Sequence, residues 1–158
     1  MNAIVPPTMP TELEDLVTYR LMKLADTVRR AATQSYGARF GITTAELRLL
    51  AVISAHQPLA ANEISRRTGL DKGWVSRSLA SLLKRGLACR TPHPEDNRAL
   101  LVSLMPAGRR LVKRITPFAA ARQRRLLADL NEREVDRMLA VMQQHADLMS
   151  APAEPGTN

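Results

Sequence analysis

The sequence predicts a mainly α-helical protein with one β-hairpin near its middle, and three observations support that class. Long stretches rich in Leu, Ala and Arg repeat their hydrophobic residues at the spacing of one helix face. Residues 99–104 alternate instead, as a strand does. Seven glycines and ten prolines in 158 residues are too few to separate many short strands, so an all-β fold is disfavoured.

The length of the chain allows one compact domain with extensions rather than a two-domain enzyme. We expect a flexible N-terminus over residues 1–10, a single folded unit over 11–149 and a flexible tail over 150–158. No run approaches about 18 uninterrupted apolar residues, and no basic segment precedes an apolar block near the start. We therefore expect no membrane span, no secretion signal and a cytoplasmic location.

The spacing Thr-x-x-Glu occurs at residues 11–14 and again at 43–46. Each pair can form a capping box, in which the hydroxyl and the carboxylate satisfy free backbone N–H groups at a helix start. The first pair predicts a helix over 11–35, followed by a glycine-containing connector over 36–42. The second pair predicts a helix that stops before Pro58.

A pair of shorter helices is predicted next. Residues 61–68 fit one helix, and Gly69 can end it in a left-handed conformation. Asp71 is a natural N-cap for a second helix over 72–85, with Gly86 as its C-terminal stop. Two helices joined by a short turn that contains Gly form the helix-turn-helix pattern.

A β-hairpin is predicted directly after this pair, with strands over 87–91 and 99–104. The loop 92–98 between them is polar and contains two prolines. A helix-turn-helix followed by such a hairpin is a winged helix. Pro106 suits the first turn of a further helix, which Pro117 should kink or divide.

The last helix is predicted to open at Asn131 and Glu134, which have cap-like spacing. The terminal helices, over 11–42 and 106–149, carry apolar stripes that a small winged unit cannot cover. Two copies of the chain can bury these stripes mutually, which makes them dimerisation helices; an intramolecular bundle is the alternative. The region 43–105 is then the winged-helix part.

Positive charge is concentrated rather than spread. The net charge is +8, and residues 60–104 and 105–125 contribute +4 and +7, whereas residues 126–158 contribute −4. A protein that is basic for solubility alone has no reason to concentrate its charge in this way. The distribution indicates a polyanionic partner.

The predicted helix 72–85 has short and basic residues opposite its apolar stripe, as a helix that enters a DNA major groove needs. Arg77 can donate two hydrogen bonds to guanine, and Ser76 can bond a base or a phosphate. The candidate DNA-binding residues on this helix are Lys72, Gly73, Trp74, Ser76 and Arg77. A solvated helix face is the alternative, and Trp74 is expected to pack against the short helix rather than approach the DNA backbone.

The tip of the predicted hairpin adds Asp96 and Arg98. An arginine at a wing tip can enter the minor groove, where negative potential is concentrated, and Asp96 can hold its guanidinium extended. Arg109 and Arg110 directly follow the wing and are candidates for phosphate contacts. A salt-bridged loop is the alternative for Asp96 and Arg98.

With these motifs in place, the sequence resembles the MarR family of bacterial winged-helix transcriptional regulators. The resemblance rests on four stretches and covers most of residues 11–149: Glu63 to Asp71, Val75 to Leu87, Asp96 to Arg98 and Leu104 to Gly108. It implies a homodimer that binds a pseudo-palindromic double-stranded DNA operator, represses transcription and is released by a small aromatic carboxylate or phenolic effector. Ala60 and Met105 depart from the family pattern, and both changes concern helix capping.

Candidate effector residues lie on the first two helices and their connector, where family resemblance implies a pocket. They are Tyr19, Arg20, Tyr36, Arg39, Phe40 and His56. An arginine or histidine beside an apolar cavity can hold a carboxylate. Core aromatics with surface arginines are the alternative.

Other classes of function have weaker support. The sequence has no glycine-rich phosphate loop, and His56, His93 and His145 lack metal-ligand spacing, so we expect neither an enzyme nor a metal or cofactor. A winged helix that binds only protein, and an oxidant sensor that uses the single cysteine, Cys89, are the remaining alternatives. A small buried group is the simpler explanation of Cys89.

Overall fold

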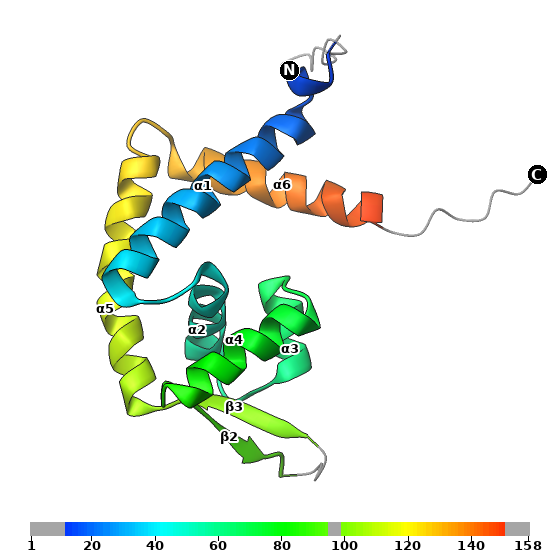
Figure 1. The fold of residues 1–158 in the computed structure, drawn as a ribbon. Coiled ribbons are helices and arrows are strands. Elements are labelled where there is room, and N and C mark those ends of the chain that lie inside the picture. Colours follow the sequence, from blue (N-terminus) through cyan, green and yellow to red (C-terminus); the bar gives the residue numbers. More distant parts are fainter. Residues whose placement is uncertain (1–11, 95–98, 151–158) are drawn as a thin grey trace, which may run out of the picture. The chain divides into compact units, whose positions relative to one another are not determined.

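The computed structural model describes residues 12–94 and 99–150 (Figure 1). Its contacts group into two compact units, one ending at Arg114 and the other beginning at Ile115, and each is described by itself. Residues 1–10 and 151–158, for which the sequence predicts flexibility, lie outside the described residues. The first unit contains, in order, η1 (Leu13–Asp15), α1 (Val17–Phe40), α2 (Thr44–His56), β1 (Leu59–Ala60), α3 (Ala61–Thr68), α4 (Lys72–Lys84), β2 (Ala88–Pro92), β3 (Leu100–Leu104) and the first residues of α5 (Pro106–Leu126). The predicted mainly helical fold is confirmed.

Helix α1 differs from the prediction at both ends. It starts at Val17 after a short 3₁₀ turn, and its N-cap, Leu16, makes no side-chain hydrogen bond; Thr11 lies outside the described residues. It continues to Phe40, so the connector expected over 36–42 is wrong. Tyr36 is buried and stacks on the ring of Phe40 at 6.2 Å between centroids, which favours continuation of the helix through Gly37.

Helix α2 begins with the capping box that its sequence predicts. Thr43 Oγ1 accepts a hydrogen bond from the Glu46 N–H at 3.1 Å, and the Glu46 carboxylate accepts one from the Thr43 N–H at 2.8 Å. The helix ends at His56, before Pro58, as expected.

The helix-turn-helix of α3 and α4 is also confirmed. Gly69 has φ of 65°, a left-handed conformation that glycine adopts without strain. Asp71 Oδ1 accepts a hydrogen bond from the Trp74 N–H at 2.8 Å, which caps α4. The Ser65 hydroxyl donates to the carbonyl of Leu70 at 2.6 Å and so fixes the turn between the helices.

The wing contains one strand more than predicted. Strands β2 and β3 pair antiparallel, with Ala88 opposite Leu104, and β1 pairs with the other side of β3. β1 has only two residues, which is too short for an alternating pattern to be visible in the sequence. Because β3 is the central strand, its apolar side chains Val102 and Leu104 are almost fully buried.

An aliphatic core joins these elements. Helices α2, α3 and α4 contact one another, and Figure 1 shows them on one side of the β2–β3 hairpin. The largest fully buried side chains are Leu49, Leu50, Ile53, Ile64, Leu79, Leu82, Val102 and Leu104. A core built from aliphatic residues holds α4 by one face only, and its other face stays exposed.

The second unit contains the remainder of α5 and helix α6 (Glu132–Ser150). Of the two outcomes expected at Pro117, a kink or a division, the division is wrong, because α5 continues through this proline; one proline removes a single backbone donor from a helix of 21 residues. Asn131 Oδ1 accepts from the Arg133 N–H at 3.1 Å and caps α6, as predicted. Within residues 12–94 and 99–150, each helix is too short or too polar to span a lipid bilayer.

Candidate nucleic-acid interface

The exposed face of α4 carries the predicted DNA-binding residues. Val75, Leu79 and Leu82 are buried on the opposite face, so the helix cannot rotate without exposing its apolar stripe. Exposed on the N-terminal half of the helix are Lys72, Gly73, Trp74, Ser76 and Arg77. The fold thus holds a rigid helix with short and basic side chains directed outward, the arrangement that suits a major groove.

Arg77 and Trp74 form a pair on this face. The guanidinium carbon of Arg77 lies 4.7 Å from the centroid of the Trp74 ring, within the range of a cation–π contact. Trp74 is 52% exposed, so its side chain is not buried against the short helix as expected. A Cβ atom at Gly73 would lie 3.3 Å from Arg77 Nη1 and 3.1 Å from Asp71 Oδ1. The glycine therefore leaves room for the Arg77 guanidinium.

A hollow beside α4 brings in two residues that the sequence analysis missed. Asn62 and Arg90 line a hollow of about 190 Å³ together with Lys72 and Ser76. Arg90 also lines a second hollow of about 390 Å³ along the wing, with Asn62 and Leu100. Arg90 could have been identified from the sequence as a basic residue in a strand that directly follows the helix-turn-helix.

The base of the wing is fixed, but its tip is not among the described residues. The His93 N–H donates to the carbonyl of Ala99 at 3.0 Å and closes the loop. Asp96 and Arg98 lie within residues 95–98, outside the described part of the chain. Their roles in the minor groove stay a prediction.

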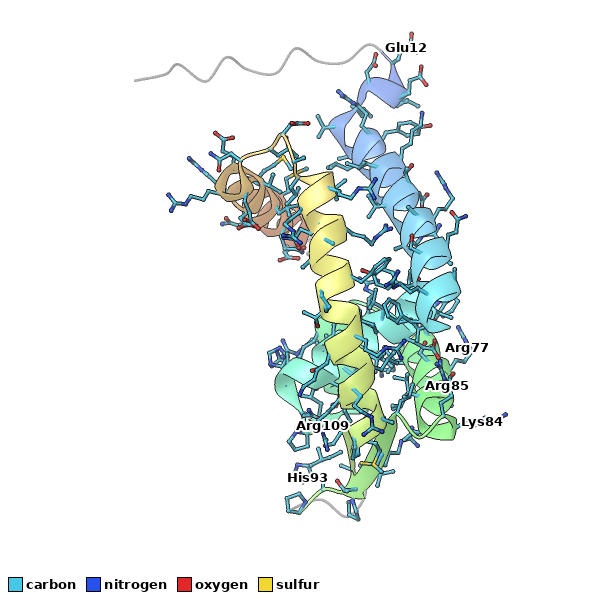
Figure 2. The ribbon with its side chains drawn as sticks, turned by 90° about the vertical axis from the view of Figure 1, so that its left-hand side faces the viewer. Glu12, Arg77, Lys84, Arg85, His93 and Arg109 are labelled. Atoms are coloured by element: carbon cyan, nitrogen blue, oxygen red, sulfur yellow. The ribbon has the colours of Figure 1, made fainter. Side chains whose placement is uncertain are left out.

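Arg109 and Arg110 are exposed at the start of α5, as their proposed phosphate contacts require. Arg109 Nη1 donates to the carbonyl of Leu104 at 2.5 Å, so its guanidinium is held at the end of β3 (Figure 2). Arg110 follows it on the same turn. A held guanidinium loses less conformational freedom when it meets a phosphate.

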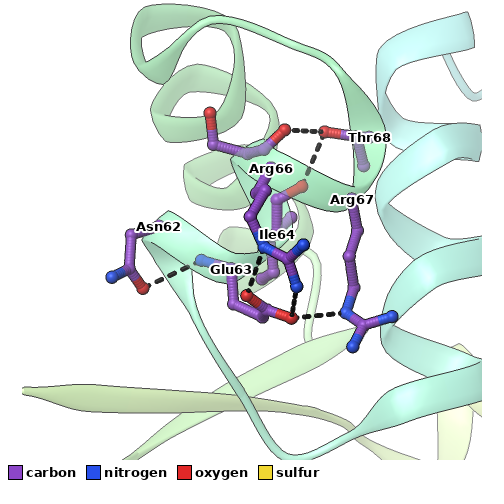
Figure 3. Close-up of polar contacts among 7 residues, drawn as sticks. Asn62, Glu63, Ile64, Arg66, Arg67 and Thr68 are labelled. Carbon is purple, nitrogen blue, oxygen red and sulfur yellow. Dashed lines mark hydrogen bonds and ion pairs between the residues drawn. The ribbon is translucent and has the colours of Figure 1, made fainter. Parts of the chain in front are cut away.

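The outer face of α3 carries a charge cluster that the sequence analysis did not identify. Glu63 accepts hydrogen bonds from Arg66 Nη2 at 2.7 Å and from Arg67 Nε at 2.6 Å (Figure 3). These bonds, of which the one from Arg66 has the larger effect, lower the pKa of the Glu63 carboxyl from 4.5 to about 2. The i,i+3 and i,i+4 spacings were the available signal.

The lowered pKa of Glu63 has a measurable consequence. Because the folded-state pKa lies below the ordinary value, the ion pairs stabilise the fold fully above pH 4.5, and this stabilisation is lost as the pH falls toward 2. In an NMR titration we expect Glu63 to titrate near pH 2, and near pH 4.5 when Arg66 and Arg67 are both replaced by Gln. An unchanged pKa in the double variant would contradict this assignment.

The predicted effector residues lie at three places: the end of α1, the start of α1 and the end of α2. Tyr36 and Phe40 stack at the C-terminal end of α1, and the guanidinium carbons of Arg39 and Arg114 lie 6.0 Å and 5.9 Å from the centroid of the Phe40 ring. Arg114 was not predicted. Tyr19 precedes Tyr36 by 17 residues of α1, about 25 Å of helix at 1.5 Å per residue.

The remaining predicted effector residues do not join the Phe40 group. Arg20 is exposed beside Tyr19 near the start of α1, and His56 is exposed at the C-terminal end of α2. Ring contacts join Tyr36, Arg39 and Phe40 at the end of α1.

Cys89 is half-buried in β2, where its thiol donates to the carbonyl of Ser103 at 3.7 Å. This contact fits a small structural group in the wing. Within the described residues, no group of three or more His, Cys, Asp or Glu side chains is arranged to hold a metal ion.

Comparison with known proteins agrees with this architecture. A profile described as MarR family matches residues 40–99. An uncharacterised HTH-type transcriptional regulator of Mycobacterium bovis is 32% identical over 113 residues, which cover 70% of this chain and 74% of that protein. Both matches include the helix-turn-helix.

Solved structures share the winged-helix fold over most of the chain. The crystal structure of a MarR/EmrR family transcriptional regulator from Acinetobacter sp. ADP1 is 27% identical, with a TM-score of 0.77 over 85% of this chain and 95% of that one. BpsR of Bordetella bronchiseptica, at 23% identity, has the same fold, with a TM-score of 0.69 over 82% of this chain and 98% of its own. The Mycobacterium and Acinetobacter proteins are both described as transcriptional regulators. The chain belongs to the MarR family of winged helix-turn-helix transcriptional regulators.

Proposed function

We propose that this regulator is a homodimer that represses transcription by occupying a pseudo-palindromic operator and leaves the DNA when a small aromatic or phenolic acid binds. The exposed face of α4 carries this proposal, because its apolar side is held in the core and its outer side presents Lys72, Ser76 and Arg77. We also propose a cytoplasmic location, because the proposed partner is genomic DNA.

Each residue of the interface has a separate role in the proposal. Arg77 reads guanine in the major groove, where its two donors match the O6 and N7 acceptors. Ser76 bonds a base or a phosphate, Lys72 contacts the phosphate backbone near the helix start, and Gly73 allows close approach of the helix. Trp74 supports the Arg77 guanidinium at 4.7 Å. Arg98, extended by Asp96, enters the minor groove.

The dimer is proposed from apolar surface left uncovered in each unit. On the N-terminal part of the first unit, Leu13, Val17 and Met22 are all more than 60% exposed. On α6, Met138 and Leu139 are about half-exposed. Exposed apolar surface of this extent is typical of a protein interface, so we assign dimerisation to residues 11–42 and 106–149 and DNA binding to 43–105.

The effector site is proposed around Phe40. Arg39 and Arg114 flank its ring, so a ligand that stacks on the ring has two cations within reach of its carboxylate. BpsR, which shares the fold, is described as regulated in its DNA binding by 6-hydroxynicotinic acid. Tyr36 completes the aromatic surface beside Phe40. Tyr19, Arg20 and His56 join the proposed site only if the second chain of the dimer brings them to it.

Release of DNA by an aromatic acid tests this function. We expect 6-hydroxynicotinic acid or a hydroxybenzoic acid to reduce the fluorescence anisotropy of a labelled operator duplex bound to the protein. Arg114→Gln should raise the acid concentration that releases half of the DNA about tenfold, because a charge-assisted hydrogen bond to the acid is lost. The DNA affinity of the variant without acid is measured first, so that a change in DNA binding itself is corrected for.

Two outcomes would contradict parts of the proposal. Acids that leave the anisotropy unchanged at saturating concentration would remove the effector claim while leaving DNA binding intact. A protein that binds no duplex with sequence preference would favour a winged helix that contacts only protein.

A further inference from the structure

A buried carboxylate lies between the two main helices of the winged unit. Glu46 on α2 is 4% exposed, and its Oε2 is used by the capping bond from the Thr43 N–H. Its Oε1 accepts from the Ser81 hydroxyl at 2.6 Å and from Arg85 Nη1 at 3.3 Å. Both donors belong to the C-terminal end of the recognition helix α4, so the capping residue also has a tertiary role.

Arg85 extends this cluster to α1. The same Nη1 atom donates to the carbonyl of Gly41 at 3.0 Å, and Gly41 is the left-handed residue that ends α1. One guanidinium nitrogen therefore ties the end of α4 both to the start of α2 and to the end of α1. Arg85 is the C-cap residue of α4, and Figure 2 labels it near Arg77, which lies eight residues earlier and about 12 Å along the helix axis.

The hydrogen bonds of this cluster fix the tilt of α4, which its apolar contacts alone do not set. The contacts of Leu79 and Leu82 set the depth of the helix in the core, but hydrophobic contact is non-directional and permits small tilts and slides. Bonds to a buried carboxylate and to a backbone carbonyl depend steeply on distance and angle. A tilt of α4 must therefore stretch the bonds of Arg85.

We propose that Glu46, Ser81 and Arg85 are positioning residues that set the orientation of the recognition helix relative to α1, and so determine how strictly the dimer discriminates operator sequence and half-site spacing. This inference rests on the proposed function, because α1 is the helix assigned to dimerisation and α4 the helix assigned to base reading. Arg85 acts through α4 and touches no DNA.

The experiment compares Arg85→Ala and Glu46→Gln with Lys84→Ala as the charge control. Gln at position 46 can still form a capping box but cannot accept from both α4 donors as a carboxylate does. Lys84 is the adjacent exposed cation on α4. Affinities are measured for the selected operator, for the operator with one base pair inserted between half-sites, and for random DNA, each at two salt concentrations.

We expect both cluster variants to bind the operator about tenfold more weakly, which corresponds to the loss of one charge-assisted hydrogen bond. Their affinity for random DNA should fall less than twofold. The penalty for the inserted base pair, large in the wild type, should shrink in both variants. Lys84→Ala should leave the ratio of operator to random affinity and the spacing penalty unchanged. Thermal unfolding shows whether each variant folds; if Glu46→Gln does not, Arg85→Ala decides alone, because the Arg85 side chain is 37% exposed whereas that of Glu46 is 5% exposed.

Two results overturn the inference. Equal weakening on all three duplexes with a reduced salt slope would make Arg85 a phosphate contact. Unchanged spacing and sequence discrimination in folded variants would show that the cluster positions nothing. A wild-type protein without any preferred duplex would overturn the proposed function itself, and this inference with it.

Discussion

Arg77→Ala is expected to weaken operator binding by about 1–3 kcal/mol, which is roughly a 5- to 150-fold loss of affinity. The reason is the loss of two hydrogen bonds to one base, which no neighbouring side chain replaces. Binding to random DNA should fall much less, because only the charge contributes there. A fluorescence anisotropy titration with both duplexes measures the ratio.

The control for this prediction is Arg110→Ala, which removes the same charge from an exposed position at the start of α5. It should lower the affinity for the operator and for random DNA by the same factor. The slope of log affinity against log salt concentration should fall by about one. Arg77→Lys should lose most of the preference for the operator and keep the affinity for random DNA, since an ammonium keeps the charge but lacks the planar pair of donors. Equal effects of Arg77→Ala and Arg110→Ala on discrimination would contradict base reading by Arg77.

Gly108→Ala is expected to destabilise the winged unit strongly, because the added methyl group meets backbone atoms. A Cβ at this position would overlap the carbonyl oxygen of Leu87 and lie 3.0 Å from its carbon. That carbonyl cannot withdraw freely, because it accepts a hydrogen bond from the Met105 N–H at 2.9 Å. Overpacking against backbone costs about 1–3 kcal/mol or more, so the midpoint of thermal unfolding should fall by roughly 5–10 °C.

Gly37→Ala is the matched control, because it makes the same change inside another helix. Nothing lies within 4 Å of a Cβ at Gly37, so the variant should gain about 0.5–1 kcal/mol from reduced backbone entropy and better helix propensity. Thermal melts followed by circular dichroism compare the two variants. A Gly108→Ala protein as stable as Gly37→Ala would show that α5 does not approach Leu87 so closely.

Local capping chemistry made the helix-turn-helix predictable. Asp71, Gly69 and the pair Thr43 and Glu46 act through backbone groups within four residues, so their effect is visible in the sequence. The extension of α1 was missed for the opposite reason. Its last turn depends on the stacking of Tyr36 and Phe40 and on burial by other elements, which a glycine-rich connector pattern conceals.

The residues of the candidate interface could be predicted from the sequence only where they all lie on one helix. The exposed residues of α4 follow from its period, because the buried stripe defines the opposite face. Arg90 and Asn62 reach the same hollow from a strand and from another helix, and Arg85 meets Gly41 across 44 residues of sequence. Such meetings depend on tertiary packing, which a single sequence does not reveal.

Selection of bound fragments from a pool of random duplex DNA, followed by sequencing, tests the central claim most directly. A dimer that presents two α4 helices related by two-fold symmetry should enrich an inverted repeat whose half-site centres lie about 10 base pairs apart, one turn of the duplex. Enrichment of a single half-site, of direct repeats, or of no sequence at all would contradict it.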